Sequence, residues 1–301
     1  MNEDSLNIDR FFEAYRGKSV FFRPNPGNAG DALIGLAALE LLEIYGIKYK
    51  IAAEDSDLDG QIVFYSGGGN LVKYYSHCAE FIKTWKSRVK EFILMPHTVN
   101  NHSELLSQLS DNVTIFCREK ETYNYLKTFS NLKSVHLTHD LAFRLNFEND
   151  LVRYNSPNNL MKIAPPKTVL KALIKKEKSP RFFLRRIDSS NTLNAFRADV
   201  ESAGRELPKN NIDLSYWCNQ KVEMMSKSVI RESAIRLTST INKFEKICTD
   251  RLHIAIAAAK LNKHVDFYNN SYNKNKNVYE YSMKGIFPRV IWKGDYNPTI
   301  E

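Results

Sequence analysis

Short apolar segments alternate with helix-like segments along the first half of the chain, and this alternation restricts the fold more than any other feature. A helix is expected at 5–16, and helical spacing of apolar residues recurs at 32–45, 71–88, 101–110 and 119–129. Strand-like runs lie at 19–22, 49–52, 61–66, 91–95, 113–117 and 135–138. Gly46 is placed to end the helix at 32–45. Strands and helices that alternate in this way predict a mainly parallel sheet in a doubly wound arrangement.

The alternation breaks between residues 145 and 180, where asparagines and prolines precede a basic run, Lys167–Lys178. A second set of signals follows, with strands expected at 181–184, 246–249 and 264–268 and helices at 219–240, 251–261 and 275–283. The sequence therefore predicts an α/β protein with two Rossmann-like domains that face a central cleft. We expect an N-terminal domain at 1–150, a linker with a basic helix at 151–180, and a C-terminal domain at 181–301 whose last residues pack back on the first domain. Ligands of such folds bind beyond the carboxyl ends of the strands.

Composition narrows the class of protein. Of the 301 residues, 43% are hydrophobic and 26% are charged, which is typical of a folded globular chain. No apolar run reaches the roughly 18 residues of a membrane span, and the acidic first residues do not resemble a secretory signal. The four scattered cysteines favour reduced core thiols in a cytoplasmic protein and argue against a zinc site, so no metal is expected. The net charge of +9 favours an anionic partner. Because no nucleic-acid-binding motif accompanies the charge, we do not expect nucleic acid to be that partner.

Two glycine-rich segments follow expected strands. In the first, Asn28, Gly30 and Asp31 lie where a strand passes into a helix, a position at which backbone N–H groups favour anions. Asp31 can serve catalysis there, or it can simply cap the helix. In the second, Gly67, Gly68 and Gly69 precede Asn70. Three consecutive glycines cost conformational entropy, so the close approach of a ligand to the backbone explains them better than a plain connection does.

Other polar residues end the remaining strands. His97 and Thr98 follow the strand at 91–95, Arg118 follows 113–117, and Arg185 follows 181–184. The guanidinium group of an arginine suits a carboxylate or a phosphate. Each residue also has a structural interpretation: His97 as a surface residue, Arg118 as the partner of Glu119 or Asp140, and Arg185 as part of a surface ion pair.

The segment Thr249–His253 carries the strongest signal. A strand passes into a helix at Asp250 or Arg251, so Arg251, Leu252 and His253 lie in the first helical turn. Leu252 is expected in the core. The helix dipole favours the neutral form of His253, which can accept a proton as a general base. The alternative interpretation is a capping or solvated histidine.

The ordered set of motifs resembles the polysaccharide pyruvyltransferase family. The motifs are Asn28-Ala29-Gly30-Asp31, Gly67-Gly68-Gly69-Asn70, Pro96-His97-Thr98, Arg118-Glu119, His139-Asp140-Leu141-Ala142, Arg185-Arg186-x-Asp188 and Thr249-Asp250-Arg251-Leu252-His253. The resemblance runs from about residue 20 to residue 285. A tail with Ser271, Lys274 and Tyr279 also looks like the end of the family pattern, although it is shifted.

The resemblance implies a GT-B-like fold, phosphoenolpyruvate as the donor, and no cofactor. It also implies a pyruvate ketal on two hydroxyls of one sugar, with galactose as a family-level expectation. Carried over, it makes His253 the catalytic base, with Asp31, His97 or Glu119 as the acid. The donor-binding set is Arg118, Arg251, Arg185, Leu252, Gly68, Gly69 and Asn70, and the acceptor-binding set is Asn28, His97 and Thr98.

The basic run has two interpretations. Lys167, Lys171, Lys175 and Lys178 share one face of an expected helix, which suits binding to an anionic membrane surface. Such a helix would bring a cytoplasmic enzyme to a lipid-linked acceptor on the inner face of the membrane. The other interpretation is an ordinary solvated linker.

Two further functions compete with pyruvyl transfer. The same architecture suits a GT-B glycosyltransferase that uses a nucleotide-sugar, although no clear reader for ribose and base is present. A non-catalytic sugar- or lipid-binding protein is the third, and it would tolerate changes at Arg118, Arg251 and His253.

Overall fold

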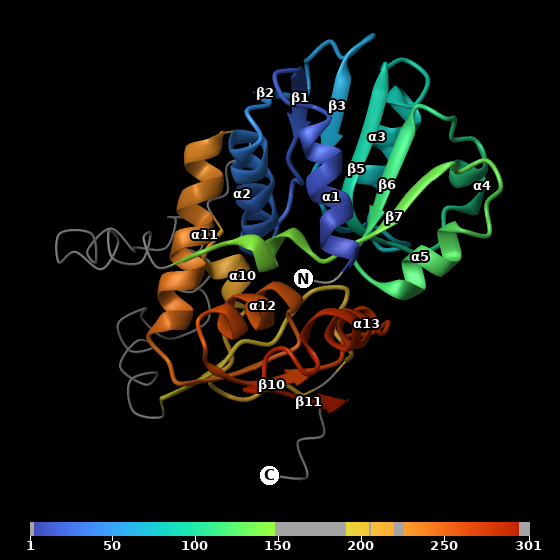
Figure 1. Cartoon of the computed structure of the whole chain (residues 1–301). Helices are drawn as coiled ribbons and strands as arrows, with labels where there is room; N and C mark the ends of the chain where they lie inside the picture. The colour runs from blue at the N-terminus through green and yellow to red at the C-terminus, as the bar shows by residue number, and fades with distance from the viewer. Residues whose placement is uncertain (1–2, 148–190, 205, 220–225, 295–301) are drawn as a thin grey trace. The chain divides into compact units, whose positions relative to one another are not determined.

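The computed structural model describes residues 3–147, 191–204, 206–219 and 226–294 (Figure 1). These residues form two compact units. The N-terminal unit holds residues 3–27, 34–144 and 226–230, and the C-terminal unit holds residues 28–33, 145–147, 191–204, 206–219 and 231–294. The domain boundaries given above stay a prediction. Residues 28–33 belong to the C-terminal unit, and residues 226–230 belong to the N-terminal unit. Strand and helix patterns in the sequence do not reveal either assignment.

The sheet of the N-terminal unit is parallel, with the strand order β2-β1-β3-β5-β6-β7 and with β4 paired to β5. The chain places β2 on one side of β1 and β3 on the other, so the sheet is doubly wound, as expected, with its reversal at β1. The strands are β1 (Ser19–Arg23), β2 (Lys48–Ile51), β3 (Ile62–Tyr65), β4 (Gly68–Leu71), β5 (Glu91–Val99), β6 (Val113–Cys117) and β7 (Ser134–Leu137).

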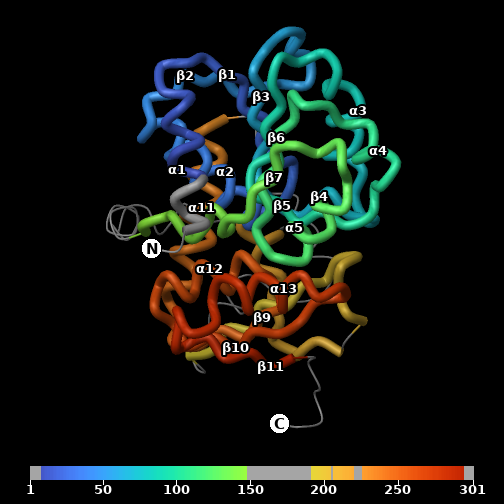
Figure 2. Tube along the Cα trace, turned by 45° about the vertical axis from the view of Figure 1, so that its right-hand side comes forward, coloured from blue at the N-terminus to red at the C-terminus, as the bar shows by residue number. Residues whose placement is uncertain are grey.

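Helices cover both faces of this sheet because its central strands are buried on both sides. On one face, the ring of Phe11 contacts Phe64 and Phe116. On the other face, Val63 and Tyr65 share a core with the next three helices. Figure 2 shows α1 and α3 on opposite sides of the strands. The helices are α1 (Glu3–Glu13), α3 (His77–Trp85), α4 (Ser103–Ser107), α5 (Lys120–Leu126) and the 3-10 turn η1 (Leu141–Arg144).

Helix α2 (Ala29–Ile44) begins three residues earlier than expected because its first turn is capped from both sides. The side-chain oxygen of Asn28 accepts a hydrogen bond from the N–H of Gly30 at 2.8 Å, and the Asp31 carboxylate accepts one from the N–H of Asn28 at 2.9 Å. This reciprocal pair is a capping box. At the other end Gly46 has a φ of +61°, which is the glycine-ended helix predicted from the sequence.

The glycine segment after β3 is a strand and not the loop that its composition suggested. β3 lies beside the first half of β5, and Gly68–Leu71 (β4) lies beside the second half, so the two are parts of one broken strand. A Cβ atom on Gly67 would lie 2.6 Å from the carbonyl oxygen of Pro96, so only glycine lets the chain pass at the break. The helix expected at 71–88 is consequently shorter, and β5 continues to Val99.

The C-terminal unit contains a second parallel sheet, with the order β11-β10-β9-β8. The strands are β8 (Thr192–Asn194), β9 (Lys246–Thr249), β10 (His264–Tyr268) and β11 (Val290–Gly294). The expected bounds of β9 and β10 are confirmed, whereas β8 and β11 were missed. Neighbouring strands follow chain order, so the described part of this sheet is parallel α/β without the reversal of a Rossmann fold.

The helices of this unit surround a small-residue core. Residues Ile254–Ala258 of α12 are fully buried, and their alanines let the helix pack closely on β9 and β10. Helix α11 belongs to both units, since its first residues lie in the N-terminal one. The elements are α10 (Leu214–Trp217), α11 (Lys227–Asn242), α12 (Leu252–Lys260), α13 (Lys274–Val278) and the π-helical turn η2 (Tyr279–Met283).

Some expectations fall on residues that the structure does not describe. They are the strand at 181–184, the basic helix at 167–178, and Arg185, Arg186 and Asp188. Among the described helices, none combines the length and the apolar character needed to cross a membrane. All four cysteines are buried and form no disulfide, as predicted. Burial raises the pKa of the Cys218 thiol to about 12, which suits a core thiol.

We expect Gly67→Ala to lower the free energy of unfolding by about 1–3 kcal/mol, because the new methyl group collides with backbone at Pro96. Gly35→Ala in α2 is the matched control: its Cβ would meet Ile230 at 3.4 Å, an ordinary contact, and should raise stability by up to about 1 kcal/mol. Urea unfolding followed by circular dichroism measures both. Equal stability of the two variants would contradict the broken-strand interpretation.

Candidate active site

Polar side chains from four strands form one hydrogen-bonded chain at the carboxyl edge of the N-terminal sheet. Asn25 follows β1, Tyr65 ends β3, Asn70 lies in β4 and His97 in β5. The side-chain oxygen of Asn25 accepts bonds from the Asn70 amide at 2.6 Å and from the Tyr65 hydroxyl at 3.1 Å. The Asn25 amide donates to the Gly67 carbonyl at 3.1 Å. Asn25, Tyr65 and His97 are all buried, so the network holds each side chain in one position.

The Nε2 atom of His97 has two contacts with Asn70 that need opposite tautomers. The side-chain oxygen of Asn70 lies 2.9 Å away and requires a proton on Nε2. The backbone N–H of Asn70 lies 3.2 Å away and requires a bare Nε2. The ring can therefore change tautomer without moving. This property suits a residue that binds or transfers a proton.

Arg118 follows β6 and is buried in an ion pair. Its Nη1 donates to Asp140 at 2.8 Å and its Nε donates to Thr98 at 2.9 Å. The Arg118 and Asp140 side chains are 1% and 0% exposed, so removing either would leave a buried charge without this partner. The geometry matches the structural interpretation of Arg118, and its role as a donor ligand stays a prediction.

Glu119 caps helix α5. Its carboxylate accepts a hydrogen bond from the N–H of Thr122 at 2.9 Å and another from the Thr122 hydroxyl. Burial raises the pKa of Glu119, and the bonds from Thr122 oppose that rise. A raised pKa suits a general acid, but both carboxylate oxygens already accept hydrogen bonds from Thr122 at the start of the helix.

In the C-terminal unit, Thr249 and Asp250 hold the strand ends together. The Thr249 hydroxyl donates to the Ala195 carbonyl at 2.7 Å and accepts from the N–H of Arg251 at 3.0 Å. The Asp250 carboxylate accepts from the N–H of Arg197 at 2.8 Å. These bonds join β8, β9 and the start of α12, and they fix Arg251 as the N-cap of that helix.

His253 occupies the second position of α12 and lies against Gly30, the second residue of α2. A Cβ atom on Gly30 would lie 2.9 Å from His253 Nδ1 and 3.1 Å from His253 Cβ. The first turns of the two helices therefore meet here, and both belong to the C-terminal unit. Asn28 and Asp31, which form the capping box of α2, lie in the same turn. Free N–H groups at helix starts attract anions, and two starts together strengthen that attraction.

Arg251 is 5% exposed and is held by two carboxylates. Its Nη2 atom donates to Asp199 at 2.9 Å and also to Asp213. The Nε atom of Arg251 has no hydrogen-bond partner within the described part of the chain. The ring of Tyr216 lies over the guanidinium, 5.4 Å from its central carbon to the ring centroid. Arg251 is thus oriented before any ligand binds.

Arg197, at the end of β8, extends this ionic cluster. It forms ion pairs with Asp199 and Glu201, and Glu201 also pairs with Lys274 at 3.0 Å. Burial raises the pKa of Asp199, but the hydrogen bond and charge of Arg197 and the charge of Arg251 outweigh it and hold the pKa at about 2. Burial likewise raises the pKa of Glu201, and Lys274 and Arg197 lower it to about 2. Both carboxylates are therefore charged at neutral pH.

The sequence profile of the family described as polysaccharide pyruvyl transferase matches residues 28–272, a range that begins at Asn28 and contains Arg118 and His253. The chain belongs to this family. A crystal structure of a functionally uncharacterised protein from Klebsiella pneumoniae is similar, with a TM-score of 0.75 and 27% identity over 99% of this chain and 100% of the other. The curated proteins include no match.

The structure distributes the predicted site residues of this pyruvyl transferase over both units. The C-terminal unit brings together Asn28, Asp31, Arg251 and His253, and it places Leu252 in the core at 4% exposure. The N-terminal unit holds a second group along one sheet edge: Gly68, Gly69, Asn70, His97, Thr98 and Arg118.

Sequence reasoning missed Asn25, Tyr65, Arg197 and Asp199. A usable signal existed for two of them, since Arg197 and Asp199 follow 192–196, a short segment in which polar and apolar residues mostly alternate as in a strand. β8 is only three residues long, so the segment was not recognised as a strand. Lys274, noted in the shifted tail motif, binds Glu201 and supports the cluster from α13.

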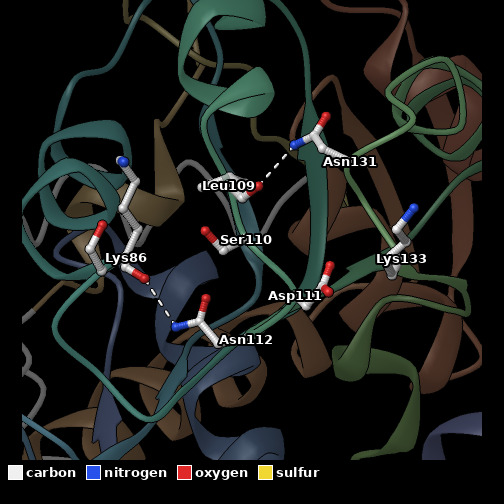
Figure 3. Close-up of a pocket in the computed structure, with 8 residues that line it drawn as sticks. Lys86, Leu109, Ser110, Asp111, Asn112, Asn131 and Lys133 are labelled. Atoms are coloured by element: carbon white, nitrogen blue, oxygen red, sulfur yellow. Dashed lines mark hydrogen bonds between the residues drawn. The ribbon is translucent and has the colours of Figure 1, made fainter.

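A surface pocket of about 600 Å³ lies at the opposite, amino-terminal edge of the N-terminal sheet (Figure 3). The side chain of Asn112 donates to the Lys86 carbonyl, and that of Asn131 donates to the Leu109 carbonyl, so the turns around the pocket are tied by asparagines. None of the predicted site residues lines it. The pocket is lined by Lys86, Ser87, Leu109, Ser110, Asp111, Asn112, Asn131 and Lys133.

We expect Asp199→Asn to make the C-terminal unit less sensitive to acid. Because the pKa of Asp199 is lowered to about 2, its stabilising effect is complete above about pH 5 and is lost as the pH falls toward 2. At pH 7 this effect amounts to about 2 kcal/mol, which the variant should lose. Urea unfolding at pH 7 and pH 3 measures it. A variant whose stability falls between these pH values as steeply as that of the wild type would contradict the ion-pair assignment.

We expect Gly30→Ala to displace the ring of His253, since the new methyl group would overlap its Nδ1 atom. Imidazole ¹⁵N resonances assigned to His253 should shift, and Gly35→Ala in the same helix should leave them in place. Unchanged His253 resonances in Gly30→Ala would show that the two helix starts do not touch in solution.

Proposed function

We propose that this pyruvyl transferase takes phosphoenolpyruvate as its donor and joins the pyruvyl group, as a ketal, to two hydroxyls of one sugar. The proposed acceptor is a galactose residue in a polysaccharide or in its lipid-linked precursor. Membership of the family supports pyruvyl transfer to a polysaccharide. The donor, the ketal and the form of the acceptor belong to the proposal.

The observation that carries the proposal is the meeting of two helix starts beside a buried arginine. The first turns of α2 and α12 touch at Gly30 and His253, and Arg251 caps the second helix. Phosphoenolpyruvate carries a phosphate and a carboxylate, and both groups suit helix N-termini and a guanidinium. A nucleotide-sugar also carries phosphate groups, so release of phosphate or of nucleotide, and not this geometry, separates the two kinds of donor.

The reaction requires one base, one acid and an anion site. A sugar hydroxyl loses its proton to His253 and attacks the second carbon of phosphoenolpyruvate, while the methylene carbon gains a proton. The bond between the second carbon and the phosphate oxygen then breaks, and phosphate leaves with the electron pair. A second hydroxyl of the same sugar attacks the same carbon and gives its proton to the carboxylate that protonated the methylene carbon. We assign the acid role to Asp31, because it lies one residue from Gly30, in the helical turn that His253 contacts.

The remaining assignments keep the roles predicted from the sequence. Asn28, His97 and Thr98 are proposed to bind the acceptor. The proposed donor ligands besides Arg251 are Arg118, Arg185, Leu252, Gly68, Gly69 and Asn70. A GT-B-like architecture and peripheral binding to an anionic membrane are also proposals, and the basic segment behind the second lies outside the described residues.

Phosphate release tests the function directly. We expect the wild type to release phosphate from phosphoenolpyruvate only when a galactoside is present, and to yield a product heavier by one ketal-linked pyruvyl group. His253→Ala should reduce kcat by about 10²–10⁴-fold, the usual contribution of a general base. His264→Ala, which removes an exposed histidine at the start of β10, is the control and should leave kcat within about twofold.

Two outcomes would contradict the proposal. Release of nucleotide from a nucleotide-sugar, without turnover of phosphoenolpyruvate, would favour a glycosyltransferase. Full phosphate release by His253→Ala would remove the histidine from its role, even if the donor is correct. Arg251→Lys should weaken binding of phosphoenolpyruvate by about tenfold or more, because lysine lacks the paired donors of the guanidinium.

A further inference from the structure

Two exposed apolar side chains adjoin the Arg251 cluster. Five large apolar residues of the described chain are clearly exposed, and Val200 and Tyr216 are two of them, at 66% and 53%. Tyr216 contacts Arg251 directly, and Val200 follows Asp199, an ion-pair partner of Arg251. Single exposed apolar side chains are common on protein surfaces, and what distinguishes these two is their position beside the proposed donor ligand Arg251.

The backbone under these two side chains is firmly held. Asn211 exchanges two hydrogen bonds with the backbone of Phe196, at 2.7 and 3.0 Å. The Asp213 carboxylate accepts one bond from the N–H of Ala198 at 3.0 Å and another from Arg251. The segment that carries Val200 and the segment that carries Tyr216 are therefore joined at two points.

Helix α10 aims Tyr216 outward. Its neighbours Leu214, Ser215 and Cys218 are buried, at 0%, 2% and 1% exposure, and anchor the helix to the unit. Burying the ring of Tyr216 would gain about 1.5–3 kcal/mol for a side chain of this size, so its exposure is a cost that packing alone does not explain. The aromatic ring is exposed and lies next to Arg251.

We propose that Tyr216, flanked by Val200, is the surface on which the acceptor sugar packs the C–H face of its pyranose ring. This inference rests on the proposed function and names the part of the C-terminal unit that recognises the acceptor. A pyranose presents C–H groups on one face, and these pack on the electron-rich face of an aromatic ring. The hydroxyls at the sugar edge remain available for deprotonation. A small trianionic donor gains little from an aromatic surface, so the sugar and not the donor suits Tyr216.

Substitutions at Tyr216 separate acceptor from donor binding. With methyl β-galactopyranoside as the acceptor, we expect Tyr216→Ala to raise the acceptor KM about tenfold, equivalent to about 1.4 kcal/mol. Tyr216→Phe and Tyr216→Trp keep the flat ring and should stay within about threefold of the wild type. The Kd of phosphoenolpyruvate should change less than about twofold in Tyr216→Phe and Tyr216→Trp, which keep a ring over Arg251. In Tyr216→Ala it should change less than the acceptor KM does, because Asp199 and Asp213 still hold Arg251. Ile291→Ala, at another exposed apolar residue of the same unit, is the control and should change neither quantity.

Saturation-transfer NMR with methyl β-galactopyranoside, methyl α-glucopyranoside and methyl α-mannopyranoside, without donor, keeps this inference distinct from the proposed function. Saturation transfer to a sugar that is lost in Tyr216→Ala supports the surface even if the wild type releases no phosphate. In that case the proposed function fails and the surface stands. Conversely, the wild type can be active while Tyr216→Ala has an unchanged acceptor KM. That result overturns the proposed role of Tyr216 in acceptor binding and leaves the proposed function intact. Binding of none of the three sugars to the wild type also overturns it, as does an equal loss of donor affinity.

Discussion

The missing side chain at Gly30 lets the first turns of α2 and α12 touch, and the anion site proposed for the C-terminal unit depends on that contact. Each helix start exposes N–H groups that its own turns cannot satisfy, and each carries partial positive charge. Asn28 and Asp31 satisfy part of this need at α2. Two positive ends held together repel one another, so an anion placed between them stabilises the arrangement. By allowing this contact, Gly30 favours the binding of an anion at the two helix starts.

The arginine beside these helix starts is already neutralised by carboxylates. Asp199 and Asp213 both bind Nη2 of Arg251, and the low pKa of Asp199 keeps its carboxylate charged at neutral pH. This pairing orients the guanidinium before a donor arrives, which lowers the ordering cost of binding. In the proposed function, the same carboxylates would compete with an anionic donor for the guanidinium of Arg251.

Much of the fold was predictable because apolar patterns are local. β9 and β10 were predicted at their observed bounds, since each is an apolar run followed by turn-forming or polar residues. The start of α2 was misplaced because Asp31 can cap a helix either as its N-cap or from within its first turn. β4 was missed because glycines suggest a loop, and only the Pro96 carbonyl, distant in sequence, explains why Gly67 precedes a strand.

The site was less predictable than the fold, because ion pairing is a tertiary property. The sequence placed Arg118 after a strand, with Asp140 as one possible partner, and the structure shows that pair. It placed Arg251 in the first turn of a helix but gave no sign that Asp199 binds it. Arg197 escaped notice because three residues of β8 are too few to form a recognisable pattern. The contact between His253 and Gly30 joins residues far apart in the chain, and no spacing rule reveals it.

The membership of residues 28–33 in the C-terminal unit has a consequence for synthesis of the chain. The ribosome releases Gly30 and Asp31 long before it makes His253, so the first turn of α2 must wait for its partners while the sheet of the N-terminal unit assembles around the rest of the helix. Residues 226–230 of α11 are the converse case, because they are made late but belong to the N-terminal unit. Neither unit is therefore a continuous stretch of chain, and a gene fragment that encodes only one half lacks a piece of its own fold.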